Sequence, residues 1–123
     1  MKNNIPQLDA LNLKRIAEFF EVITFNNDFD LVYEKQISNT GIILFHGVIE
    51  LFKKKKSLLI NTPGSIVGIN SMLENVPLHY NCRVKKDSTI IMLPKSEMIK
   101  ILQRRNDPLF KLISECSQMD IAS

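Results

Sequence analysis

The stretch TPGSIVGINSML, residues 62–73, places two glycines four positions apart, each after a short run of other residues. Pro63 and Gly64 indicate a tight turn, because proline fixes φ and glycine adopts positive φ at little cost. The residues after Gly68 can form one helical turn. Such a turn can hold an anion on backbone N–H groups. No charged residue follows Gly68 within the stretch, so it has the shape of an anion site without a charged side chain.

Short runs rich in strand-forming residues lie on both sides of this stretch, and turn residues separate them. The runs are EVITF (21–25), FDLVYE (29–34), IILFHGVIELF (42–52), SLLIN (57–61), SIV (65–67), LHYNCRV (78–84) and TIIML (89–93). Many short strands at regular spacing are typical of a sandwich or barrel, and not of a sheet built from βαβ units. The sequence therefore predicts a mainly β core over about residues 22–93.

Helical spacing of apolar residues frames this core. It predicts one helix over about residues 9–20, with Asp9 as a possible N-cap, and two more over about 95–104 and 108–119. Asp107 and Pro108 suit a helix start, since aspartate caps the helix and proline tolerates its first turn. With 123 residues, we expect residues 1–123 to form a single domain.

The composition excludes several classes of protein. Hydrophobic residues make up 45% of the chain and the net charge is +3, which is an ordinary globular balance. No apolar run approaches the roughly 20 residues of a membrane span, so we expect a cytoplasmic protein without one. Cys82 and Cys116 form no disulfide framework and are expected to be packing residues. No nucleophile elbow, Walker loop or pair of carboxylates on one face indicates an enzyme.

The order of these elements resembles the cyclic-nucleotide-binding domain, the sensor module of the catabolite-activator family of regulators and of cyclic-nucleotide-gated kinases and channels. Three segments carry the resemblance: LVYEKQISNTGIILFHGVIELF (31–52), TPGSIVG (62–68) and TIIMLPKSEMIKIL (89–102). It extends over about residues 11–119. The resemblance implies a double-stranded β-helix, jelly-roll-like, in which two antiparallel sheets form a β-roll with an N-terminal helix and two C-terminal helices.

The resemblance also implies a phosphate-binding cassette, which we compare position by position. In the family a glycine precedes a glutamate that accepts from the ribose hydroxyl, and helix-start N–H groups meet the cyclic phosphate. Gly68 matches the glycine, but Ile69 stands at the glutamate position and cannot accept a hydrogen bond. Asn70 and Ser71 follow at the expected helix start. Backbone N–H groups of residues 68–71 remain as ligands for a weakly bound anion.

The family's cassette also contains an arginine that pairs with the phosphate. That position falls near Leu78, with His79 beside it, whereas Arg83 lies several residues further along and reaches the position only through a gapped alignment. Loss of both the glutamate and the arginine is expected to weaken cyclic-nucleotide binding by roughly three orders of magnitude or more.

The sequence therefore predicts a non-enzymatic regulatory module that needs no cofactor and acts through another protein or a second copy of itself, as a homodimer. No recognition helix follows the last predicted helix, so direct DNA binding is not expected. Two alternatives stay open. One is a genuine sensor of a cyclic mono- or dinucleotide with a rearranged pocket of Gly68, Asn70, Ser71, His79 and Arg83. The other is the sensor fragment of a longer transcription regulator.

Three further features have a simpler interpretation than a binding site. The run Lys53 to Lys56 could attract nucleic acid, anionic lipid or an acidic partner, but a solvated hairpin tip is the simpler interpretation. His79 and Cys82 lie three apart, yet two ligands alone rarely hold a metal. His46 is expected to be a partly buried structural histidine.

Overall fold

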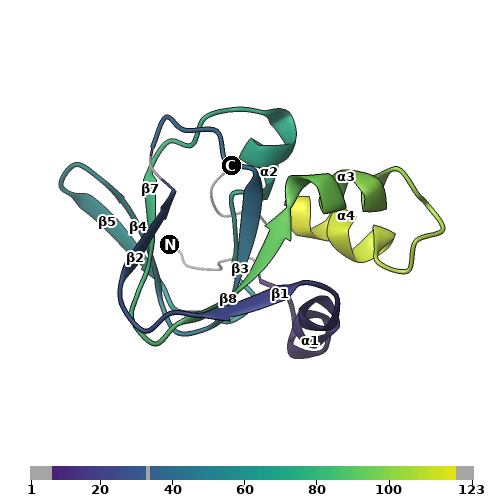
Figure 1. The fold of residues 1–123 in the computed structure, drawn as a ribbon, viewed down its shortest axis with the longest axis horizontal. Coiled ribbons are helices and arrows are strands. Elements are labelled where there is room, and N and C mark those ends of the chain that lie inside the picture. The colour runs from purple at the N-terminus through teal and green to yellow at the C-terminus, as the bar shows by residue number, and fades with distance from the viewer. Residues whose placement is uncertain (1–6, 33, 119–123) are drawn as a thin grey trace.

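Two antiparallel sheets face each other in the computed structural model, which describes residues 7–32 and 34–118 (Figure 1). The first sheet has the strand order β1 (Glu21–Thr24), β8 (Thr89–Pro94), β3 (Thr40–His46) and β6 (Ile66–Val67). The second has the order β2 (Phe29–Val32), β7 (Asn81–Val84), β4 (Ile49–Lys53) and β5 (Lys56–Ile60). Every neighbouring pair is antiparallel, and β4 and β5 are joined by a tight hairpin turn. The predicted β-roll with flanking helices is confirmed.

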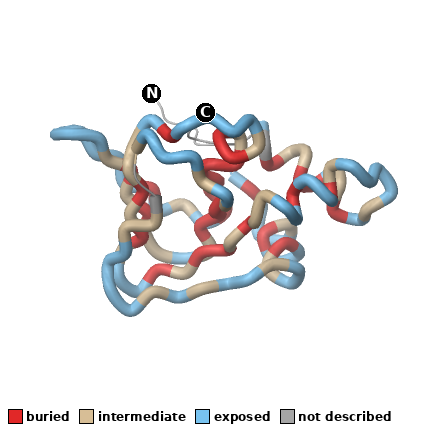
Figure 2. The backbone as a smooth tube through the Cα atoms, turned by 45° about the horizontal axis from the view of Figure 1, so that its top comes forward, coloured by how far each residue is buried: buried red, intermediate tan, exposed pale blue. Residues whose placement is uncertain are grey.

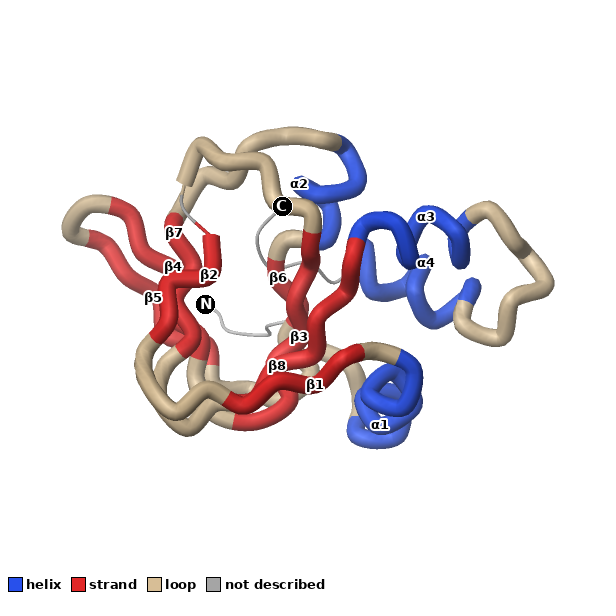
Figure 3. The backbone as a smooth tube through the Cα atoms, viewed as in Figure 1, coloured by secondary structure: helices blue, strands red, loops and turns tan. Residues whose placement is uncertain are grey.

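Four helices occur in the described residues, and most of them lie on one side of the roll. They are α1 (Ala10–Phe19), α2 (Ile69–Glu74), α3 (Lys95–Leu102) and α4 (Phe110–Gln118). Figure 3 shows α3 and α4 side by side beyond the first sheet, α1 next to β1, and α2 directly after β6. The short α2 follows the TPGSIVG stretch, where one helical turn was expected.

The helix boundaries follow from the capping residues. Asp9 is the N-cap of α1, as predicted, and its carboxylate accepts from the backbone N–H of Asn12 at 2.8 Å. Asp107 accepts from the N–H of Leu109 at 2.8 Å. This bond closes a turn before the helix, so α4 begins at Phe110 and not at Pro108. The predicted end of this helix at Met119 lies outside the described residues, and α3 ends at Leu102, two residues earlier than predicted.

The core divides into two clusters on the two faces of the first sheet. Side chains alternate along β3, so Ile42 and Leu44 face the roll interior while Ile43 faces the helices. The helix cluster comprises Leu8, Leu13, Ile16, Ile43, Ile66, Ile69, Met72, Ile91, Leu93, Met98, Ile101, Leu109, Leu112, Ile113 and Cys116. The roll cluster comprises Ile42, Leu44, Ile49, Leu51, Ile60, Val67, Cys82, Val84 and Ile90. Figure 2 shows these buried positions along the central strands, whereas the β4–β5 hairpin tip is exposed.

One sequence-based expectation about a side chain is wrong. His46 is exposed, and not partly buried. It ends β3 at a shift in register between Leu44 and His46, where the strand turns toward Gly47. The irregularity breaks the alternation that would have directed the ring inward. Among the described residues, no helix has both the length and the apolar character needed to cross a membrane.

Candidate functional site

The cassette-like segment has the backbone shape that the sequence predicts. Gly68 adopts φ 81° and ψ 10°, the left-handed conformation that turns the chain from β6 into α2. A Cβ atom at Gly68 would meet no atom within 4 Å, so the residue borders open space. The N–H of Met72 donates to the carbonyl of Gly68 at 3.3 Å and closes the first helical turn. Gly68 is therefore needed for its backbone conformation rather than for close packing.

Ile69 is directed into the protein and is completely buried in the helix cluster. It packs against Gly41 of β3, where an added Cβ would lie 2.6 Å from Ile69 Cγ1. Such an approach leaves no room for another side chain. The position at which the resemblance implies a ribose acceptor is therefore occupied by a hydrocarbon that belongs to the core.

The remaining cassette positions provide few side-chain groups for a ligand. Asn70 is half-buried and Ser71 is buried on α2, and Gly68 and Asn70 already take part in interactions of their own. Leu78, at the expected arginine position, is also buried. Its N–H donates to the Gln36 carbonyl at 3.0 Å and its carbonyl accepts from Lys35 at 2.7 Å. Leu78 thus joins the segment before β7 to the turn after β2.

Arg83 lies on the opposite face of β7 from the roll cluster. Cys82 and Val84 point into that cluster, so the strand alternation directs Arg83 outward. Its Nε donates to Asp30 Oδ1 at 2.5 Å, and its guanidinium lies 4.6 Å from the centre of the Phe52 ring. The Asp30 carboxylate raises the pKa of the Arg83 guanidinium. The structure therefore places Arg83 in a surface ion pair and does not bring it to residues 68–71.

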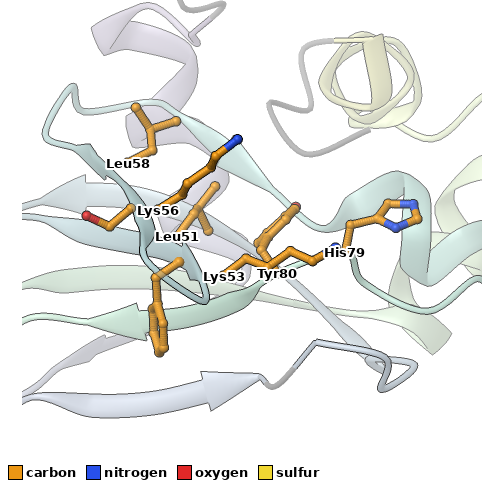
Figure 4. Close-up of a pocket in the computed structure, with 8 residues that line it drawn as sticks. Leu51, Lys53, Lys56, Leu58, His79 and Tyr80 are labelled. Carbon is orange, nitrogen blue, oxygen red and sulfur yellow. The ribbon is translucent and has the colours of Figure 1, made fainter.

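A pocket of about 410 Å³ lies between the β4–β5 hairpin and the segment before β7 (Figure 4). We call it the hairpin pocket. Lysine and histidine nitrogens and an apolar surface meet there, and its lining residues are Leu51, Phe52, Lys53, Lys56, Ser57, Leu58, His79 and Tyr80. Figure 4 shows Lys53 extending alongside Tyr80 in the direction of His79. Among the predicted site residues, only His79 is part of this pocket.

Sequence reasoning considered the lysine run and His79 separately and missed the rest of this pocket. A signal was present in the hairpin pattern. The tip of a two-residue turn places Lys53 opposite Lys56 and Leu51 opposite Leu58, so these four share one face. The approach of Tyr80 depends on the pairing of β7 with β4, which no local pattern predicts.

The described residues offer no metal site, since no group of three or more His, Cys, Asp or Glu side chains lies together there. His79 is exposed whereas Cys82 is buried, so the two do not face a common space. Burial raises the pKa of the Cys82 thiol to about 12, and burial with the nearby Glu115 charge raises the pKa of Cys116 to about 12. Both thiols are protonated at neutral pH and are poor nucleophiles.

Comparison with known proteins identifies structural neighbours only. No protein-family model and no curated protein matches the sequence. A structure solved for a cyclic-GMP-dependent signalling pathway that regulates bacterial phytopathogenesis is 16% identical, with a TM-score of 0.74 over 92% of this chain and 93% of that chain. A cyclic nucleotide-binding domain from Methylobacillus flagellatus is 14% identical, with a TM-score of 0.68 over 95% and 68%. The catabolite activator protein of Thermus thermophilus is 15% identical, with a TM-score of 0.67, and the match covers 90% of this chain but only 52% of that protein.

Proposed function

We propose that this chain, which has the fold of a cyclic-nucleotide-binding domain, is a non-enzymatic regulatory module that does not bind cyclic nucleotide through its cassette. The burial of Ile69 carries the proposal. A ribose hydroxyl placed beside the cassette would meet no acceptor there, because the side chain at this position packs against Gly41 in the helix cluster. An unmatched polar group of this kind costs about 1–3 kcal/mol.

The position of Arg83 supports the same proposal. Moving its guanidinium toward the cassette would break the ion pair with Asp30 and the approach to Glu50, where Nη1 lies 3.7 Å from the carboxylate. With Arg83 held in this ion pair, the cyclic phosphate would depend on the backbone N–H groups of a helix of six residues. Without a paired cation, a desolvated phosphate loses several kcal/mol of binding, and each 1.4 kcal/mol is about tenfold in affinity.

Exposed apolar side chains support the proposal that the module acts by contact with another protein or a second copy of itself. Leu11 and Phe19 on α1 are 71% and 62% exposed, and Val22 on β1 is 41% exposed. Phe19 also borders a hollow of about 260 Å³ beside α3 and the turn before α4. Large apolar side chains that remain exposed are typical of an interaction surface. We propose that this α1–β1 surface, defined by Leu11, Phe19 and Val22, contacts the partner.

Calorimetric titration of cyclic AMP, cyclic GMP and cyclic di-GMP into the protein tests the first part of the proposal. We expect no binding with a Kd in the micromolar range for any of the three. Micromolar binding by one of them would contradict the proposal and favour a genuine cyclic-nucleotide sensor with a rearranged pocket. Amide chemical shifts of residues 68–71 recorded in the same titration would locate such binding at the cassette.

Light scattering over a range of protein concentrations tests the second part. If a second copy is the partner, the wild type dimerises and the variants Leu11→Ser and Phe19→Ser shift it toward monomer. Leu59→Ser is the matched control, since Leu59 is 59% exposed but lies on β5. A wild type that is monomeric at every concentration would exclude the second copy, and equal effects of all three variants would exclude the α1–β1 surface.

A further inference from the structure

We propose that the hairpin pocket binds a small organic anion in which one phosphate or carboxylate group is attached to an apolar ring. This site lies outside the cassette, because none of residues 68–71 lines it. It therefore goes beyond the regulatory role proposed above and does not depend on it. The proposal rests on the charge of the pocket, on its apolar surface and on its size.

The charge of the pocket favours an anion. Lys53, Lys56 and His79 line it, and none of its lining residues is an aspartate or glutamate. The Glu34 carboxylate reaches Lys53 Nζ only at 4.0 Å, and the Lys53 side chain is 52% exposed. An exposed pair at this distance contributes little. Lys53 can therefore exchange this partner for a ligand phosphate or carboxylate, to which a lysine ammonium binds by a charge-assisted hydrogen bond.

The apolar surface of the pocket favours a ring on the same ligand. Leu51 belongs to the roll cluster and Tyr80 packs against it, so both present a fixed surface. Leu58 lies opposite Leu51 across the hairpin but is 48% exposed. An apolar ring placed here would cover Leu58 and pack on Tyr80, which gives a favourable burial of apolar area.

The pocket is large enough for a small molecule. Its volume of about 410 Å³ lies within the range of roughly 300–1,000 Å³ that is typical of small-molecule sites. The basic side chains and the apolar surface come from two segments, residues 51–58 and 79–80, that line the same open hollow (Figure 4). A single ligand with an anionic end and an apolar end matches both.

Titration of isotope-labelled full-length protein with 1-naphthyl phosphate and with 1-naphthoic acid, followed by amide chemical shifts, tests the proposal. We expect at least one of them to bind with a Kd at or below about 1 mM and to shift amides of residues 51–58 and 79–80. The preferred probe tells whether the anionic group is a phosphate or a carboxylate. Inorganic phosphate alone and 1-naphthol alone should each bind at least tenfold more weakly. Absence of shifts at these residues with both probes would overturn the proposal.

Two pairs of variants separate the pocket from general attraction to the basic hairpin tip. Lys53→Gln with Lys56→Gln should weaken the probe at least tenfold, whereas Lys54→Gln with Lys55→Gln should change its Kd less than twofold. Both double variants remove two charges from the same tip, but neither Lys54 nor Lys55 lines the hairpin pocket. Equal weakening by the two double variants would overturn the proposal.

The second pair concerns two exposed neighbours on β5. Leu58→Glu places a carboxylate in the pocket and should abolish probe binding, whereas Leu59→Glu should not, because Leu59 is absent from the lining and pairs with Glu50. Unperturbed amide spectra of the helices would show that both variants fold. Equal loss in both variants would overturn this inference and leave the cassette proposal intact. Amide shifts confined to residues 68–71 on addition of a cyclic nucleotide would overturn the cassette proposal and leave this inference intact.

Discussion

Ile69 and Gly41 touch across the boundary between α2 and β3, and this contact determines the character of the cassette. Gly41 has no side chain, so the Ile69 side chain and the backbone of β3 approach closely. An isoleucine in this place stabilises the helix cluster by burial of apolar area, about 1.5–3 kcal/mol for a complete side chain. A glutamate in the same place would carry a charge into an apolar core. Packing and ligand binding therefore make opposite demands on this residue.

This contact predicts a coupling between two substitutions. Gly41→Ala should destabilise the protein by about 1–3 kcal/mol, because the new Cβ overpacks the site beside Ile69. Ile69→Ala alone should cost about 2–5 kcal/mol through the cavity it leaves. In the double variant the smaller side chain makes room for the new Cβ. In urea denaturation, the double variant should therefore lose less free energy of unfolding than the sum of the losses in the two single variants.

Gly68→Ala serves as the control for this pair. Its Cβ would meet open space, so its cost comes only from the positive φ and should not depend on residue 69. Additive effects of Gly41→Ala and Ile69→Ala would show that the close approach does not limit the packing.

Strand β7 shows how one element separates the two faces of the second sheet. Its inward residues complete the roll cluster, and its outward Arg83 lies between Asp30 on β2 and Glu50 on β4. Lys85 continues the row after the strand, with Nζ at 3.0 Å from Asp28 and 3.9 Å from Glu50. Exposed pairs of this kind contribute little stability individually. Opposite charges on facing strands do favour this register over a slip by one residue, which would exchange the two faces.

The stability of this row should depend on acid pH through Asp28. The Lys86 backbone N–H donates to Asp28 at 2.7 Å, and this bond, with the Lys85 ammonium at 3.0 Å, lowers the Asp28 pKa from 3.8. A carboxyl whose pKa is lower in the folded state stabilises the fold above 3.8 and loses this contribution as the pH falls toward the lowered value. Urea denaturation at neutral pH and well below 3.8 should therefore show a larger loss of stability for the wild type than for Asp28→Asn.

Asp28→Asn keeps an oxygen that can accept from Lys86 but removes the charge, so it isolates the titration from the hydrogen bond. Equal losses of stability in the two proteins on acidification would show that Asp28 does not contribute to the pH dependence.

At the scale of the whole molecule, the first sheet is a shared wall between the helix cluster and the roll cluster. Neighbouring residues of β3 and β8 point into different clusters, as Ile43 and Ile91 face the helices while Ile42 and Ile90 face the roll. Neither cluster can lose this sheet without exposing the other. We therefore expect the described part of the chain to unfold as one cooperative unit.

The two buried thiols allow this expectation to be measured. Cys82 lies in the roll cluster and Cys116 in the helix cluster, and burial keeps both protonated at neutral pH. The single-cysteine variants Cys82→Ala and Cys116→Ala each leave one thiol as a reporter. After correction for the stability of each variant, both thiols should react with a thiol reagent at the rate of global unfolding. Faster labelling of Cys116 would show that α4 opens separately from the roll.

Much of the fold could be predicted from the sequence, because short-range chemistry determines it. Turn residues separate the strands, and a period of two or of about 3.6 distinguishes strands from helices. Asp9 and Gly68 specify a cap and a left-handed turn through their own backbone and side-chain geometry. The sequence predicts the start of α4 two residues too early, since capping residues mark a turn without fixing where the helical hydrogen bonds begin.

The sequence by itself determined the order of strands and helices, the glycine turn before α2 and the hydrocarbon at residue 69. Only the tertiary structure decided that Ile69 packs on Gly41, that Arg83 faces Asp30, and that residues 79–80 meet the β4–β5 hairpin. The physical reason is the range of the interactions. Caps, turns and periodicity act over a few residues, whereas the pairing of β7 with β4 joins segments about thirty residues apart and selects the side chains that share a space.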